Sequence, residues 1–390
     1  MGANAAPTPA VVAAFVASAL AAAVPAGSVA AQTVELEARV RSYTVGAVHV
    51  TERLMPITFT LNGSRARLRM TTTPLTFDAP SSQVTGTTPL STRLDLRIRT
   101  DDSLRLYVDG ASRPNTLDSL QNAALGSVGT STLDLDSYAL GAPTVFGARG
   151  SIAIWRGESA QLRLRAGMDV SPQPAGTSSV YWRGTTVRGG LSLRGTSEGK
   201  AYGLGADLAM SHADSLGGRN LFPGGGSLSL NGDATLPVGE SSLRVTFSGF
   251  LVHPVGDTRN DQPNRLIPIG NFYGLSALGS ALIGNTLVFP SVSLMRESSA
   301  ATTGTGLQAQ SMTGSGWALA PSLAASVPLG SHMDLNPEAA VVLGSVGARY
   351  VQTVVIPGGL RRRGRAASSV SGFDDHISGW WLALGVEIHR

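Results

Sequence analysis

From about residue 33 to its end, the chain repeats one unit, in which an alternating apolar and polar stretch is followed by a turn and a second alternating stretch. The first stretch alternates apolar with charged side chains at Val34, Glu35, Leu36, Glu37, Ala38, Arg39, Val40 and Arg41. Because the side chains of a strand point alternately to opposite faces, such a stretch predicts a strand with one apolar and one polar face. A soluble β-sandwich would bury the apolar face against a second sheet. A transmembrane barrel would turn that face to lipid and the charged face to a water-filled lumen.

The N-terminal segment predicts a signal peptide. Residues 1–31 contain no charged side chain, and residues 11–25 form an almost unbroken apolar run. Small residues stand directly before Gln32, as a cleavage site requires. The alternative is a single membrane anchor, but Pro25 interrupts the apolar run before it reaches the roughly 20 residues that a membrane span needs. We therefore expect residues 1–31 to be removed and residues 32–390 to form the folded domain.

The alternating segments pair across short turns and predict about sixteen strands, with a range of fourteen to eighteen. Every short turn contains Gly, Asn or Asp, which reach the positive φ that a tight hairpin needs. Short turns alternate with longer connections along the chain, as in an up-and-down transmembrane barrel, whereas a β-sandwich has no reason to sort its connections by length. The expected strands are 33–44, 56–61, 65–72, 92–99, 103–109, 151–155, 160–170, 185–194, 200–211, 227–236, 242–253, 271–283, 286–297, 316–328, 332–346 and 378–389.

This pattern resembles the bacterial outer-membrane β-barrel proteins over the whole mature chain. Residues 317–329 followed by 332–346 are similar to late hairpins of porins and of the MetA-like barrels associated with uptake of aromatic compounds. The resemblance implies an all-β, antiparallel up-and-down barrel in the outer membrane of a Gram-negative bacterium, with a role in transport. The chain departs from the family at its end, where Ile388-His389-Arg390 replaces the usual terminal aromatic residue.

The resemblance also implies partners. We expect contacts with the barrel assembly machinery, with outer-membrane lipid and with the small solutes that pass through, while a homotrimer and a monomer both stay open. The basic run at residues 361–365 suits anionic lipopolysaccharide, although a solvated charge run is the other interpretation. The net charge of +4 is too small and too dispersed to predict binding of nucleic acid.

The polar faces of the expected strands are rich in arginine. The residues expected to line the pore are Arg39, Arg41, Arg65, Arg67, Arg69, Arg93, Arg97, Arg99, Arg105, Arg163 and Arg165. Arg188, Arg194 and Arg244 continue this face, and the acidic residues Asp207, Asp233, Asp334, Glu338 and Glu387 face inward from the later strands. Adjacent strands are neighbours in a barrel, so an arginine wall should face a sparser acidic wall and favour anions. The alternative is that these charges only pair with one another and hydrate the lumen.

The longest expected connection, residues 110–150, is a candidate for a pore constriction. It follows the fifth expected strand, and in sixteen-stranded porins the long loop at this place folds inward. Its apolar residues fall at helical spacing behind a suitable N-cap. On folding inward, Asp118, Asp134 and Asp136 would pair with the facing arginines. The alternative is an extracellular loop with a single helical turn.

Residues typical of enzymes are sparse. The chain has no cysteine, and its six histidines are scattered without a spacing of four, so we expect neither a metal site nor a cofactor. Residues 195–199 match G-x-S-x-G, but strands flank them, whereas a nucleophile elbow joins a strand to a helix. We expect no enzyme activity.

The sequence therefore predicts an outer-membrane channel for passive diffusion of small solutes, with a preference for anions. A carrier for hydrophobic or aromatic compounds is the first alternative, and it would require an apolar pocket. A structural or adhesive surface barrel that transports nothing is the second.

Overall fold

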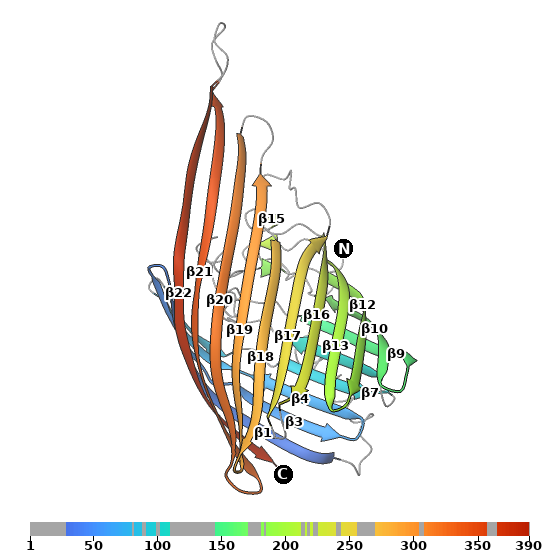
Figure 1. Ribbon diagram of the computed structural model, residues 1–390. Helices are drawn as coiled ribbons and strands as arrows, with labels where there is room; N and C mark the ends of the chain where they lie inside the picture. The colour runs from blue at the N-terminus through green and yellow to red at the C-terminus, as the bar shows by residue number, and fades with distance from the viewer. Residues whose placement is uncertain are drawn as a thin grey trace, which may run out of the picture.

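The computed structural model is an all-β barrel (Figure 1). Among the residues it describes, no helix is long and apolar enough to cross a membrane. The expected constriction residues Asp118, Asp134 and Asp136 lie outside the described part of the chain. That part comprises residues 29–79, 82–87, 91–98, 102–109, 145–170, 181–182, 185–211, 215–216, 219–220, 225–238, 243–255, 270–303, 308–356 and 365–389.

One large antiparallel sheet contains nineteen strand segments. Its first half consists of β1 (Val29–Val45), β2 (Val48–Leu54), β3 (Ile57–Gly63), β4 (Ala66–Thr72), β5 (Pro74–Ala79), β6 (Ser82–Thr87), β7 (Ser91–Arg97), β8 (Ser103–Asp109), β9 (Val145–Arg156) and β10 (Ala160–Val170). Its second half consists of β12 (Thr185–Ser197), β13 (Lys200–Ser211), β16 (Gly225–Pro237), β17 (Arg244–Val255), β18 (Gly270–Ile283), β19 (Thr286–Thr303), β20 (Gln308–Pro328), β21 (Met333–Ile356) and β22 (Arg365–His389). A small second sheet contains β11 (Tyr181–Trp182), β14 (Ser215–Leu216) and β15 (Arg219–Asn220).

Three pairs of these segments are single strands with a break, so the barrel has sixteen strands. The segments β2 and β3 pair with successive parts of β1 and are separated at Met55 and Pro56. The segments β4 and β5 are separated at Thr73, directly before Pro74, and β6 and β7 pair with β5 and β4 in the same way. Proline lacks the backbone N–H that a ladder needs, which accounts for the breaks before Ile57 and at Pro74.

The sheet closes on itself through its first and last strands. β1 pairs with β22 over the whole stretch from Thr33 opposite His389 to Val45 opposite Ile377. Closure leaves no open sheet edge at membrane depth, where no water would satisfy the unpaired backbone groups.

The barrel wall is apolar outside and polar inside. On β12 the outward Val187 and Leu191 are about half exposed, whereas the residues that follow them, Arg188 and Ser192, face the interior and are more buried. Large exposed apolar side chains of this kind occur on most strands, which a soluble protein would not tolerate. An antiparallel barrel with an apolar outer band and a polar interior is the architecture of bacterial outer-membrane proteins.

Each expected strand coincides with a strand of the barrel, but several expected connections are wrong. The segment 73–91, expected as a long loop, contains β5 and β6, and β2 fills most of the expected connection before residue 56. The late strands also extend far beyond their expected ends, since β21 has 24 residues and β22 has 25. About 9–11 residues suffice to cross a membrane. Strands β19 to β22 therefore rise as a tall wall on one side of the barrel (Figure 1).

The alternation of faces can be tested by cysteine labelling in liposomes. Leu164→Cys should face lipid and Arg163→Cys should face water, because neighbours on β10 point to opposite faces. A membrane-impermeant maleimide should label the second variant far faster than the first. The pair Val187→Cys and Arg188→Cys on β12 provides a matched control on another strand. Equal rates within both pairs would contradict the assignment of the two faces.

Candidate functional site

Arginines from four consecutive barrel strands meet on the inner wall. They line a cavity of about 580 Å³ together with Asp95, Asp207 and several serines. The arginines are Arg105 of β8, Arg149 of β9, Arg163 and Arg165 of β10, and Arg188 and Arg194 of β12. Each arginine projects inward because it lies on the polar face of its strand. Antiparallel pairing places the four strands side by side.

Asp169 contacts two of the six arginines that line this cavity, which together form the arginine wall. Its carboxylate accepts hydrogen bonds from the Tyr107 hydroxyl and from Arg188, and Arg149 Nη2 lies 3.4 Å from Asp169 Oδ2. The guanidinium of Arg149 also lies 5.3 Å from the centre of the Tyr107 ring. The Asp169 side chain is only 9% exposed, so it neutralises the arginines without offering a free charge to the lumen. The cluster of Asp169, Tyr107, Arg149 and Arg188 therefore links strands β8, β9, β10 and β12 and also balances part of their charge.

Two further aspartates pair with arginines of the wall. Arg105 Nε lies 2.5 Å from Asp95 Oδ1, and Arg165 Nη2 lies 2.6 Å from Asp207 Oδ2. The six arginines thus outnumber the three aspartates near them, and the wall keeps an excess of positive charge.

Arg163 and Arg194 carry two of these three surplus charges, and the third arises because Arg149 and Arg188 share Asp169. Arg163 donates hydrogen bonds to the Ser151 hydroxyl, at 2.8 and 2.5 Å, rather than to a carboxylate. Arg194 is exposed to the cavity and makes no ion pair with any residue that the structure describes. Arg163 stands opposite Ser192, two residues before Arg194, so the two arginines are diagonal neighbours about 7–8 Å apart at their Cα atoms. Together they could bind one anionic group.

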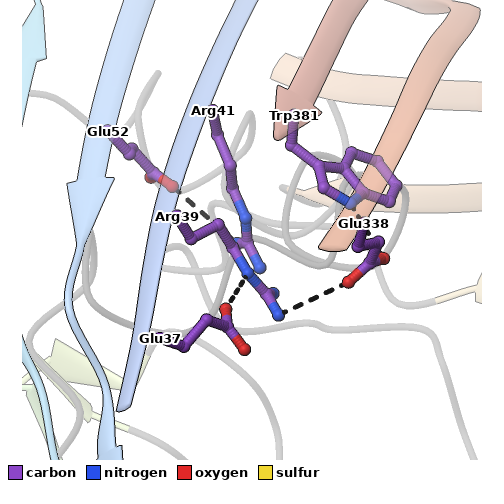
Figure 2. Close-up of polar contacts among 6 residues, drawn as sticks. All are labelled: Glu37, Arg39, Arg41, Glu52, Glu338 and Trp381. Atoms are coloured by element: carbon purple, nitrogen blue, oxygen red, sulfur yellow. Dashed lines mark hydrogen bonds and ion pairs between the residues drawn. The ribbon is translucent and has the colours of Figure 1, made fainter. Parts of the chain in front are cut away.

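Arg39 and Arg41 of β1 are held in ion pairs near the seam with β22 (Figure 2). Arg39 lies 2.6 Å from Glu37 and 3.8 Å from Glu338, and the Trp381 indole donates a hydrogen bond to Glu338. Arg41 lies 3.8 Å from Glu52, and both side chains are about 6% exposed. Arg41 therefore offers little charge to the lumen, although the sequence pattern placed it in the pore lining.

The remaining expected pore-lining arginines lie on β4, on β7 and at the turns nearby. Arg67 and Arg69 are on β4, Arg93 and Arg97 are on β7, and Arg65 precedes β4. Arg69 stands directly opposite Arg93, and its guanidinium is 3.6 Å from Glu35. Arg99 lies outside the described residues. The arginine wall of β8 to β12 thus continues across the neighbouring strands β7 and β4.

An apolar cluster occupies the inner face at the tall side of the barrel. Tyr43, Val342, Val346 and Ile377 belong to it, and Trp381 packs against them. The four cluster members are at most 8% exposed. They therefore present almost no apolar surface to a solute.

Two members of the wall were not found from the sequence. Arg149 was missed because its strand was expected to begin at residue 151, whereas β9 begins at Val145. Tyr107 lies on an expected strand and has the same inward parity as Arg105, which was the available signal. Its bond to Asp169 of β10 crosses the intervening strand β9, which the alternation of faces along one strand does not reveal.

No protein-family model and no curated protein matches the chain. Among solved structures, the outer-membrane protein OpdK of Pseudomonas aeruginosa is 10% identical with a TM-score of 0.45, covering 92% of this chain and 99% of that one. OprB of Pseudomonas putida is 8% identical with a TM-score of 0.46, at coverages of 92% and 94%. OccK2 of Pseudomonas aeruginosa, solved with glucuronate, is 12% identical with a TM-score of 0.37, at coverages of 92% and 96%. These distant similarities do not identify a solute for this chain.

Replacing Asp169 should destabilise the barrel. Asp169→Asn removes the charge that Arg149 and Arg188 share, so we expect a loss on the order of 1–3 kcal/mol in free energy of unfolding, measured by urea titration in lipid vesicles. Asp95→Asn is the matched control, because its pair with Arg105 is largely exposed and should contribute less than about 1 kcal/mol. Equal effects of the two substitutions would contradict the structural role of Asp169.

Proposed function

We propose that this protein is a passive outer-membrane channel for small solutes and that its arginine wall gives it a preference for anions. The lumen is lined by charged and hydroxyl side chains, which suit polar rather than apolar solutes. Passage needs no bound cofactor and no chemical step, so the wall acts by its electrostatic field alone.

The observation that carries this proposal is the pair Arg163 and Arg194. Most other arginines of the cavity already share an aspartate, and an arginine whose charge is neutralised attracts a passing anion only weakly. Arg163 and Arg194 lack a carboxylate among the described residues and line the same cavity. An anion between them would gain charge-assisted hydrogen bonds without breaking an existing ion pair.

The two alternatives have less support. A carrier for hydrophobic compounds needs an accessible apolar pocket inside the barrel, and the inner apolar cluster around Val342 is almost fully buried. A structural or adhesive surface barrel does not require arginines gathered on one side of its lumen. It would conduct nothing, which is directly measurable.

The proposal predicts the reversal potential of single channels in planar bilayers under a KCl gradient. The natural protein should favour chloride over potassium. The double variant Arg163→Glu with Arg194→Glu reverses two lumen charges and should move the reversal potential toward cations. Raising the salt from 0.1 M to 1 M should shrink this difference, because the Debye length falls from about 10 Å to about 3 Å.

The control is Lys200→Glu, which reverses one charge next to the turn between β12 and β13. It should leave the reversal potential near that of the natural protein. An unchanged potential in the double variant would reduce the two arginines to structural roles. A folded barrel without any conductance would favour the surface barrel instead.

A further inference from the structure

Four potential metal ligands stand together where β21 begins and β22 ends. Asp334 is directly opposite Glu387, and two residues further along each strand the backbone N–H of His389 donates to the carbonyl of His332 at 2.8 Å. The pair His332 and His389 therefore continues the antiparallel register of Asp334 and Glu387. Residues two apart on a strand share a face, so the four side chains form a two-by-two square on one face of the barrel wall.

Three members of this square already converge. His389 Nε2 lies 3.0 Å from Asp334 Oδ2, and His389 Nδ1 lies 3.8 Å from Glu387 Oε1. One ligand atom from each of the three residues lies within 4.8 Å of the others. Their side chains are 29% to 38% exposed, which leaves the group accessible to an ion from water. His332 is the fourth corner and is exposed.

We propose that His332, Asp334, Glu387 and His389 form a binding site for a divalent transition metal of the Zn²⁺ type. Zinc takes His nitrogen and carboxylate oxygen at about 2.0–2.2 Å, usually with four ligands in a tetrahedron. Ligand atoms in such a shell are therefore separated by roughly 3.3–3.6 Å. The three converging residues need only small side-chain rotations to reach this spacing, and their backbones are fixed by the strand ladder.

The charges around the square give a separate reason for a cation. Glu387 has a carboxylate opposite it on both sides, Asp334 on β21 and Glu35 on β1. Like charges directly opposite one another destabilise a sheet. Glu35 has Arg69 at 3.6 Å. Among the described residues, Asp334 and Glu387 both form their ion pairs with His389, which is charged only when protonated. A divalent ion would offset this repulsion whether or not the histidine is protonated.

The ligand types select among metals. Imidazole suits Zn²⁺ and its transition-metal neighbours, whereas Ca²⁺ and Mg²⁺ prefer shells made entirely of oxygen. Two histidines with two carboxylates therefore favour Zn²⁺ over the alkaline-earth ions. The site lies at the turn end of the barrel, away from the cavity around Arg163, so its existence does not depend on the proposed transport function.

The test is calorimetric titration of the folded, detergent-purified barrel with Zn²⁺ at neutral pH. We expect one saturable equivalent that a large excess of Ca²⁺ or Mg²⁺ does not displace. His389→Ala and the conservative Glu387→Gln should each weaken binding about tenfold or more, and so should His332→Ala. The matched control is His376→Ala, a histidine on the outer part of the same strand β22, which should bind Zn²⁺ as the natural protein does.

A spectroscopic readout separates a built site from loose surface binding. Co²⁺ in a mixed nitrogen and oxygen shell should give visible absorption bands that vanish in His389→Ala, while heat-modifiable migration on a gel shows that the variant barrel has folded. Absence of saturable Zn²⁺ binding would overturn the proposal, and so would equal affinity in the natural protein and His389→Ala. Unchanged affinity in His332→Ala would remove that residue from the ligand set.

Discussion

Everything in this molecule depends on the pairing of its first strand with its last. In the hydrocarbon core of a membrane no water is available to the backbone, so a sheet can cross only when every N–H and C=O finds a partner within the protein. The thirteen residue pairs between β1 and β22 close the sheet and meet this requirement. Closure then fixes two environments, lipid outside and water inside, and each strand must alternate between them.

The sorting of charge around the wall follows from that division. Arginine is costly on a lipid-facing surface, and the cavity-lining arginines of β8 to β12 all point inward. Within the interior they are unevenly distributed, with arginines dominating β4 to β12 and carboxylates gathered on β1, β21 and β22. The resulting field runs across the lumen rather than along it. Such a field would orient a solute with separated charges inside the lumen.

The alternation of apolar and polar residues made the strands predictable. Where this alternation fades, the expected connections and strand ends were wrong. Each of the sixteen expected segments lies on a barrel strand because lipid on one face enforces alternation. Beyond the membrane neither face meets lipid, so the pattern fades while the ladder continues, as in β5, β6 and the outer part of β22. The alternation along each strand also predicted that Arg163 and Arg194 point inward. It could not predict which side chains they contact, because those contacts depend on register between strands. The proximity of Asp334, Glu387 and His389 could not be read from the alternation either, since it depends on register between strands.

The order of the strands has a consequence for how the barrel assembles. Apart from the seam, each barrel strand pairs only with the strands before and after it in the chain, so the wall can grow one strand at a time. The seam between β1 and β22 joins residues more than 300 positions apart, such as Thr33 and His389. Non-local contacts of this kind slow folding most strongly. The meeting of the two chain ends, rather than any hairpin, therefore sets the pace at which a finished barrel appears.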